Sequence, residues 1–332
     1  MKRLALHNKK AYLEEVSLPE PHDEWVLIKI MSAPICGGDK KAFLSEERLP
    51  YSKTVYGHEG TGIVEAVKGS NMLKAGDRVI LNPLAGCGKC YLCRSGNYIH
   101  CKNKPAFDTN FAEYALVQDF VCTPLPDDIS YDTGSLACCT LGPAYRAVRQ
   151  LNLQAFDTIL ISGLGPVGLG AIAIAKFLGA RVIAVGNNPY RRHLAQDLGA
   201  DAMLDPEDPD IAKQIEAAKS KAPLLKGIEC SGSSKAERLA LDSLDRLGTL
   251  TLIGQNHTEI PIRPSEDFIA KGLSLVGIWH YNMNDAEGMY AILRHAANLD
   301  KLITHRFALS DAQSAFEELV LKNNGKIVIK PW

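Results

Sequence analysis

Four cysteines lie within one short stretch of the sequence with the spacing C-x2-C-x2-C-x7-C: Cys87, Cys90, Cys93 and Cys101. The stretch also contains glycine and asparagine, which suit a loop that folds back on itself. Zn²⁺ accepts sulfur ligands in a tetrahedron, and four protein ligands leave no position open for a substrate. The spacing therefore predicts a structural zinc site, because four unrelated buried thiols would rarely fall so regularly in a polar loop.

A glycine-rich segment, GLGPVG, covers residues 163–168 and follows the apolar run TILIS. Gly163 permits a tight turn, Gly165 lets the backbone approach a pyrophosphate, and Gly168 lets helix and strand pack closely. A helical run and a further strand come next, in the order of a dinucleotide-binding unit. In this context the segment predicts a dinucleotide-binding site rather than a simple tight turn.

The second strand of that unit, RVIAV, ends at Gly186, where an NAD site normally places an acid that holds the ribose hydroxyls. Without that carboxylate, a 2′-phosphate meets no repulsion. Asn187 offers hydrogen bonds at this point, and Arg191 and Arg192 add positive charge. We therefore predict NADP as the preferred cofactor and NAD as the second choice. The alternative is that both arginines only cover an exposed helix start.

A third set of candidate groups lies in the first half of the chain. Cys36 occurs in the segment ICGGD, and His58 and Glu59 directly precede the strand-like run TGIVEAV. A lone cysteine or histidine is most often an ordinary core residue. Beside a zinc loop and a dinucleotide segment, however, they predict a second, catalytic metal site. Two ligands need a third, and the segment ACCTLGPAY offers either Cys138 or Cys139.

The elements that must position these groups fall into two patterns. The first half of the chain is divided into short β-branched runs by turn residues, as in EWVLIKIMSA. From about residue 144, apolar strands alternate with helices, which is typical of a parallel sheet covered on both faces. We predict an α/β protein with a Rossmann-type, doubly wound parallel sheet over residues 144–279. A mostly β domain with both zinc sites takes residues 1–143 and 280–332.

The bulk composition narrows the class of protein. A chain of 332 residues suits two domains. Its net charge of −1, without a long run of one sign, argues against nucleic acid or an anionic membrane as partner. Nine cysteines without an export signal favour thiolate ligands over a disulfide framework. We expect a cytoplasmic homodimer or homotetramer that acts on a small molecule.

In their order and spacing, these segments resemble the zinc-containing medium-chain dehydrogenase/reductase family, which includes alcohol, sorbitol and threonine dehydrogenases. The resemblance covers nearly the whole chain and extends to FAEY at 111–114, ECSG at 229–232 and the closing GKIVIK. It implies a GroES-like fold for the catalytic domain and two zinc ions per chain. It also implies hydride transfer between NADP or NAD and an alcohol, polyol or cyclitol hydroxyl, or the corresponding carbonyl.

The resemblance assigns roles to the candidate metal-site residues. Cys36 and His58 bind the catalytic zinc, and Glu59 lies behind the metal. Asp39 accepts the second ring hydrogen of His58 and so orients the imidazole. The family pattern C-x5-Y selects Cys139 as the third ligand and leaves the remaining thiols structural: Cys122, Cys138 and Cys230.

The resemblance also assigns cofactor contacts. Val167 and Gly168 contact the pyrophosphate, while Ser231, Gly254 and Trp279 line the nicotinamide side. Lys326 reaches a phosphate, unless it is a solvated lysine at a strand edge.

Two departures from the family concern the substrate. Gly38 stands where relatives carry a serine or threonine that relays the substrate proton, and Lys41 replaces a frequent histidine. Only nine residues separate Cys101 from Phe111, so the pocket rim is unusual. A substrate with several hydroxyls would fill the space at Gly38. The alternatives are a zinc-independent reductase of the same fold that acts on activated double bonds, and a non-catalytic scaffold that binds NADP.

Overall fold

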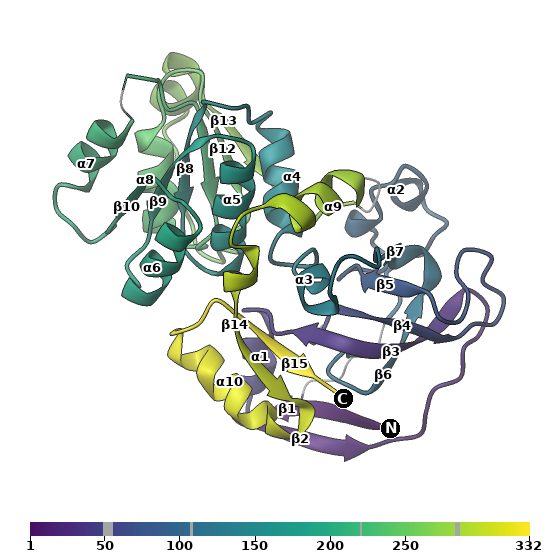
Figure 1. The fold of residues 1–332 in the computed structure, drawn as a ribbon. Coiled ribbons are helices and arrows are strands. Elements are labelled where there is room, and N and C mark those ends of the chain that lie inside the picture. The colour runs from purple at the N-terminus through teal and green to yellow at the C-terminus, as the bar shows by residue number, and fades with distance from the viewer. Residues whose placement is uncertain (49–55, 107–108, 220, 283–285) are drawn as a thin grey trace. The chain divides into compact units, whose positions relative to one another are not determined.

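The computed structural model describes residues 1–48, 56–106, 109–219, 221–282 and 286–332. The chain forms two compact units (Figure 1). The first comprises Met1–Cys139, Asn282–Leu293 and Ile303–Trp332, and the second comprises Thr140–Tyr281 and Arg294–Leu302. The divisions after residues 139 and 281 lie within four residues of the predicted 143 and 279, and the added segment 294–302 was not anticipated.

The first unit is mostly β, and its strands pair antiparallel except for β14 and β15, which are parallel. A seven-stranded sheet has the order β14-β15-β3-β4-β5-β7, and β6 pairs with β3 off this path; β1 and β2 form a separate hairpin. Along β3 the buried side chains pack with those of the neighbouring strands, and Phe111 meets Phe316 edge to face at 5.7 Å. The strands are β1 (Lys2–His7), β2 (Lys10–Glu15), β3 (Trp25–Pro34), β4 (Gly60–Ala66), β5 (Arg78–Leu81), β6 (Tyr114–Gln118), β7 (Cys122–Pro124), β14 (Ile303–Ala308) and β15 (Lys326–Lys330).

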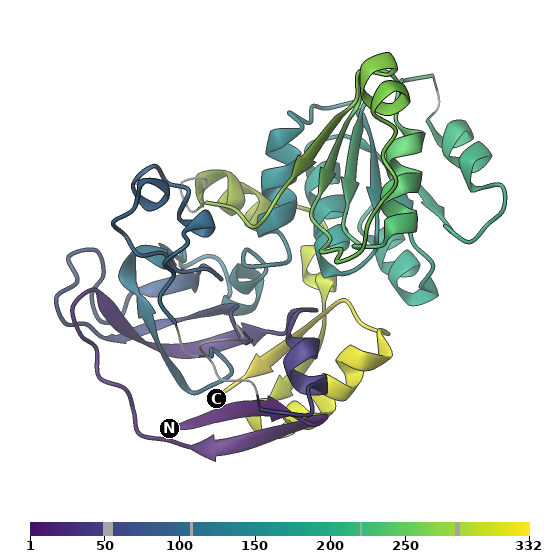
Figure 2. The same cartoon turned by 180° about the vertical axis from the view of Figure 1, so that it is seen from behind.

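The first unit also contains short helices (Figure 2). They are α1 (Asp39–Leu44), α2 (Tyr91–Arg94), α3 (Tyr131–Ser135), α9 (Ala286–His295) and α10 (Ala312–Leu321), with 3-10 turns at η1 (Tyr98–His100), η2 (Asp119–Val121) and η6 (Leu309–Asp311). Within the described ranges, every helix of the chain is too short or too polar to reach across a lipid bilayer.

The second unit is a six-stranded parallel sheet in the order β10-β9-β8-β11-β12-β13. Its strands read as continuous apolar runs because helices cover both faces (Figures 1 and 2). The chain leaves β8 toward β9 and β10, then returns to the other side of β8 for the remaining strands. The strands are β8 (Thr158–Ser162), β9 (Arg181–Val185), β10 (Ala202–Leu204), β11 (Lys226–Glu229), β12 (Thr249–Leu252) and β13 (Ser274–Gly277).

This reversal of direction beside β8 is the switch point at which open parallel sheets bind ligands. The doubly wound Rossmann sheet predicted from the sequence is confirmed. The covering helices are α4 (Gly142–Gln150), α5 (Pro166–Phe177), α6 (Pro189–Asp197), α7 (Ile211–Ala218) and α8 (Ser234–Ser243), with a π-helix, η3 (Pro264–Ala270), and a 3-10 turn, η5 (Leu299–Leu302).

A buried carboxylate fixes η3 to α8. Asp267 accepts hydrogen bonds from Arg238 Nη1 at 2.8 Å and Arg263 Nη2 at 2.9 Å, and its side chain is 2% exposed. We expect Asp267→Asn to lower the free energy of unfolding by about 2 kcal/mol, because both guanidinium groups lose their buried partner. Urea denaturation at pH 7 measures this loss, and Asp242→Asn, at a half-exposed acid of the same network, should cost less than about 1 kcal/mol.

The loss of unfolding free energy caused by Asp267→Asn should decrease as the pH falls. Arg238 holds the pKa of Asp267 well below its ordinary value of 3.8. A carboxylate with a depressed pKa in the folded state contributes stability above its unfolded pKa, and the contribution fades as the pH falls. The difference between the parent protein and Asp267→Asn should therefore shrink below pH 3.8. An equal loss at pH 7 and pH 3 would show that the carboxylate charge is not the cause.

Candidate active site

Strand pairing in the first unit brings the candidate metal ligands together. Cys36 follows the end of β3, and His58 and Glu59 immediately precede β4. Since β3 and β4 are antiparallel neighbours, with Ser32 opposite Thr61, the end of one strand lies beside the start of the other. Cys139 belongs to a different part of the chain, in the turns that follow α3.

The four side chains form one buried cluster. Each of Cys36, His58, Glu59 and Cys139 offers an atom, and all these atoms lie within 4.8 Å of one another. His58 Nε2 lies 3.2 Å from Cys139 Sγ, a separation that two ligands of one tetrahedral ion adopt. Two thiols and an imidazole are donors that Zn²⁺ prefers, so the residues fit a zinc ion.

The structure also separates the two adjacent cysteines. Cys139 joins the cluster, whereas the thiol of Cys138 donates to the carbonyl oxygens of Leu81 at 3.2 Å and Gly60 at 3.7 Å. Burial raises the pKa of Cys138 to about 12, so it remains a neutral thiol. Sequence spacing alone left both residues open as the third ligand, and the chain geometry favours Cys139.

The groups around Cys36 favour its thiolate form. The hydrogen bond from Cys139, followed by the hydrogen bond and charge of His58, holds the pKa of Cys36 well below its usual range despite burial. Burial acts to lower the pKa of His58, but the hydrogen bond and charge of Cys36 raise it to about 9. The neighbours of Cys36 therefore favour its thiolate form, which is the form that binds a metal.

Asp39 plays a different part from the one predicted. Its Oδ1 lies 3.7 Å from His58 Nδ1, too far for the expected hydrogen bond. Its oxygens instead accept the backbone N–H of Cys36 at 2.7 Å and of Gly57 at 3.0 Å. One fully buried carboxylate thus joins the two loops that carry the ligands, and burial raises its pKa to about 7.

The structure also corrects the interpretation of Lys326. Its side chain is 2% exposed, and its Nζ lies 2.6 Å from Glu59 Oε1. It is neither a solvated lysine at a strand edge nor a group directed at a phosphate, because its charge is paired with a carboxylate of the cluster. No local pattern could reveal this contact, since 267 positions separate the two residues.

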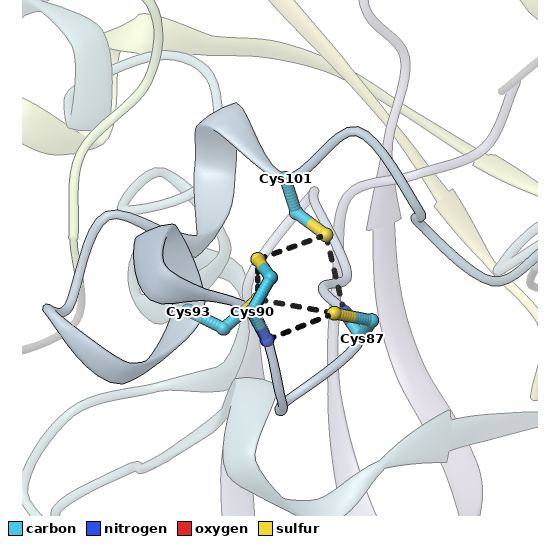
Figure 3. A group of neighbouring side chains, drawn as sticks. All are labelled: Cys87, Cys90, Cys93 and Cys101. Atoms are coloured by element: carbon cyan, nitrogen blue, oxygen red, sulfur yellow. Dashed lines mark hydrogen bonds between the residues drawn. The ribbon is translucent and has the colours of Figure 1, made fainter.

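The cysteine loop closes on itself as its spacing predicts (Figure 3). The sulfur atoms of Cys90 and Cys93 lie 3.6 Å apart, and those of Cys90 and Cys101 lie 3.9 Å apart. Backbone N–H groups donate to sulfur, with Cys90 N at 3.4 Å from Cys87 Sγ. The N–H groups of Lys89 and Cys90 lower the pKa of Cys87 to about 6. The four thiols therefore fit a second zinc ion.

The candidate cofactor residues of the second unit lie at the carboxyl ends of its strands. Gly163 turns out of β8, and α5 begins after Gly165 and includes Val167. A Cβ on Gly168 would lie 1.8 Å from the carbonyl oxygen of Gly163, so close packing requires this glycine. The first turn of α5 can therefore face a pyrophosphate, as predicted for this segment.

Three further residues follow the ends of neighbouring strands. Ser231 comes after β11, Gly254 after β12, and Trp279, 41% exposed, after β13. Sequence reasoning missed the group that shapes this edge. Glu229, fully buried, accepts hydrogen bonds from Ser231 N at 2.7 Å and Gly232 N at 3.0 Å. An acid two residues before the serine in ECSG was the available signal.

The end of β9 differs in detail from the sequence interpretation. A Cβ on Gly186 would lie 2.6 Å from the side chain of Leu164, so any larger residue at this position requires Leu164 to shift. Arg192 pairs with Asp205 at 3.3 Å, while Arg191 is half-buried and Asn187 is exposed. Asn188 caps α6 by accepting the N–H of Arg191 at 3.0 Å. Arg191 and Arg192 both lie at the start of α6, beside the end of β9, and both stay candidates for a 2′-phosphate contact.

Comparisons with known proteins agree with these observations. Residues 22–127 match the alcohol dehydrogenase GroES-like domain, and residues 166–295 match the zinc-binding dehydrogenase domain. An L-threonine 3-dehydrogenase from Chromobacterium violaceum is 32% identical over 99% of this chain and 99% of its own. A D-arabitol-phosphate dehydrogenase from Enterococcus avium is 30% identical over 98% of this chain and 94% of its own.

A solved structure shows the same fold. An alcohol dehydrogenase from Thermus sp. ATN1 superposes with a TM-score of 0.91 at 24% identity, over 99% of both chains. The domain matches and the full-length relatives establish more than the fold. The chain belongs to the zinc-containing medium-chain dehydrogenase/reductase family and is an NAD(P)-dependent dehydrogenase of the alcohol/polyol type.

Proposed function

We propose that this dehydrogenase oxidises a hydroxyl of a polyol or cyclitol, or reduces the corresponding carbonyl, with NADP preferred over NAD. The observation that carries the proposal is the convergence of Cys36, His58 and Cys139 within 4.8 Å. The names of the two relatives above, which concern D-arabitol phosphate and L-threonine, support a substrate with several polar groups.

The proposed reaction uses two sites of the chain, one for the metal and one for the cofactor. Cys36, His58 and Cys139 would hold a zinc ion, while Asp39 ties together the loops of the first two ligands. When bound, zinc supplies a Lewis acid that lowers the pKa of a nearby hydroxyl, and the nicotinamide takes up hydride. Residues 163–168 would hold the pyrophosphate at the start of α5.

Oxidation of the substrate hydroxyl releases a proton, which must be transferred to solvent. Asp39 is buried and engaged by two backbone N–H groups, and Gly38 carries no side chain to relay a proton. Gly38 is exposed, and the nearest atom to a Cβ built on it is Cys36 Sγ at 3.9 Å. A second hydroxyl or an amine of the substrate, or water, can occupy this space and pass the proton outward.

Gly38→Ser tests this exit route. We expect the new side chain to fit but to displace the second substrate hydroxyl, raising KM for the preferred polyol about tenfold, or ~1.4 kcal/mol. Steady-state kinetics on the polyol and on a simple primary alcohol measure the change, and Gly38→Ala separates added volume from the added hydroxyl. Faster turnover of simple alcohols with unchanged polyol kinetics would contradict the substrate-assisted route.

Cofactor preference is tested at α6. We expect Arg191→Ala to lower the ratio of kcat/KM with NADP to that with NAD at least about tenfold, because a charge-assisted hydrogen bond to the 2′-phosphate contributes roughly 1.5–3 kcal/mol. Asp205→Asn releases Arg192 from its ion pair and should raise the ratio. Equal effects of Arg191→Ala on both cofactors would show that the arginine only covers the helix start.

A combined metal and activity assay tests the proposal as a whole. We expect two zinc ions per chain, and cofactor reduction in a screen of alcohols, polyols and aminocyclitols with both NAD and NADP. One zinc ion per chain, together with reduction of activated double bonds, would identify a zinc-independent reductase instead. Tight NADP binding without turnover of any substrate would identify a non-catalytic scaffold.

The proposed assembly is a homodimer or homotetramer. The strand β13 supports it, because it is an edge of the parallel sheet and its residues are half-exposed or exposed. Such an edge offers backbone groups that can pair with another chain. Light scattering of the purified protein distinguishes one, two and four copies.

A further inference from the structure

The contact between Lys326 and Glu59 lies directly beside the candidate catalytic metal site. Glu59 is fully buried, and its two oxygens face different groups. Oε1 accepts from Lys326 Nζ at 2.6 Å, and Oε2 accepts from the backbone N–H of Cys139 at 3.4 Å. Glu59 is also one of the four side chains whose ligand atoms lie within 4.8 Å of one another. Its carboxylate is therefore within reach of an ion bound by the other three.

The position of Lys326 is set by the sheet rather than by its own flexible side chain. It begins β15, which pairs with β14 on one side and with β3 on the other. The N–H of Ile35, next to Cys36, donates to the carbonyl oxygen of Ile327, next to Lys326, at 2.9 Å. The backbone of Lys326 thus has a fixed place relative to the ligand loop, and the ion pair with Glu59 orients its side chain.

The charges of the cluster require such a cation. Two thiolates and Zn²⁺ sum to zero when the imidazole is neutral, so the metal and its three ligands would leave no positive charge to offset an ionised Glu59. A buried charge without a partner costs several kcal/mol. Lys326 offsets that charge. Without it, the nearest cation available to Glu59 would be the metal itself.

A fourth protein ligand would change the nature of the site. Zinc with four protein ligands is a closed, structural site, whereas a catalytic site keeps one position open for substrate. We propose that Lys326 is a positioning residue that holds Glu59 away from the metal and so keeps its fourth position open. This inference rests on the proposed function of the cluster. Lys326 itself touches neither substrate nor cofactor in this role.

Cobalt substitution tests the proposal without using turnover. Co²⁺ is exchanged into the catalytic site of the full chain while the cysteine loop keeps zinc, and the visible spectrum reports the number and type of its ligands. Imidazole is then titrated as a probe of the open position. We expect Lys326→Met to change the spectrum and to weaken imidazole binding at least tenfold, while Lys326→Arg, which keeps the cation, retains tight binding.

The double variant separates positioning from a general structural effect. If Lys326 acts through Glu59, the variant with both Glu59→Gln and Lys326→Met should bind imidazole as Glu59→Gln alone does. The double variant also removes both buried charges together. It can therefore be measured even if Lys326→Met alone fails to fold. Circular dichroism and thermal melting verify the fold of each variant.

Several outcomes would overturn the proposal. One is a Lys326→Met protein with the parent spectrum and parent imidazole affinity. Another is a double variant that binds imidazole as weakly as Lys326→Met does. Failure of the parent protein to take up cobalt outside the cysteine loop would overturn the proposed function as well, and so is distinguishable from the first two results.

Discussion

Replacement of Cys139 by alanine should reduce kcat/KM for alcohol oxidation by about a thousandfold or more and should remove one of the two proposed zinc ions. Loss of a thiolate from a three-ligand site opens the metal to exchange with solvent. The Lewis acid contributes several kcal/mol to the transition state, and each 1.36 kcal/mol corresponds to a factor of roughly ten. Steady-state kinetics and metal analysis of the same preparation measure both effects.

The adjacent cysteine provides a matched control. Cys138 is equally buried, but its thiol faces the carbonyl oxygens of Leu81 and Gly60 instead of the cluster. Cys138→Ala should therefore keep both zinc ions and most of the activity, at a cost of about 1 kcal/mol in stability. Equal losses of zinc and activity in the two variants would show that Cys139 is not the selected ligand.

Replacement of Cys90 by alanine should lower the melting temperature by roughly 10 °C and release the other zinc ion. Structural zinc binding contributes folding free energy directly, and a loss of 3–5 kcal/mol shifts the melting temperature by about 2–4 °C per kcal/mol in a unit of this size. The effect should be large because the loop around the four cysteines contains only one short helix and one 3-10 turn. Differential scanning calorimetry measures the shift.

A chelator and a second cysteine provide the controls for this prediction. A strong zinc chelator should lower the melting temperature of the parent protein but should have less effect on Cys90→Ala, which has already lost the ion. Cys122→Ala removes a buried thiol outside both clusters, so its zinc content should not change. A Cys90→Ala protein with two zinc ions and the parent melting temperature would show that the loop does not need the metal.

Much of the protein could be predicted where the relevant residues are close in sequence. The four cysteines of the zinc loop fall within 15 positions, so their spacing alone indicates a closed metal site. GLGPVG lies directly between its strand and its helix, and the alternation of apolar strands with helices indicates the parallel sheet. In these cases short-range chain geometry determines the arrangement, so the local sequence pattern is enough to predict it.

The tertiary structure decided the points that depend on contacts between distant segments. The choice between Cys138 and Cys139 depends on which thiol reaches Cys36 and His58, since that of Cys138 faces backbone carbonyl oxygens instead. The role of Asp39 depends on the distance to a loop 18 positions away, and that of Lys326 on its pairing with Glu59 across 267 positions. Antiparallel pairing of β15 with β3 brings Lys326 close to Glu59. The residues adjacent to Lys326 in the sequence do not indicate which strand β15 will pair with.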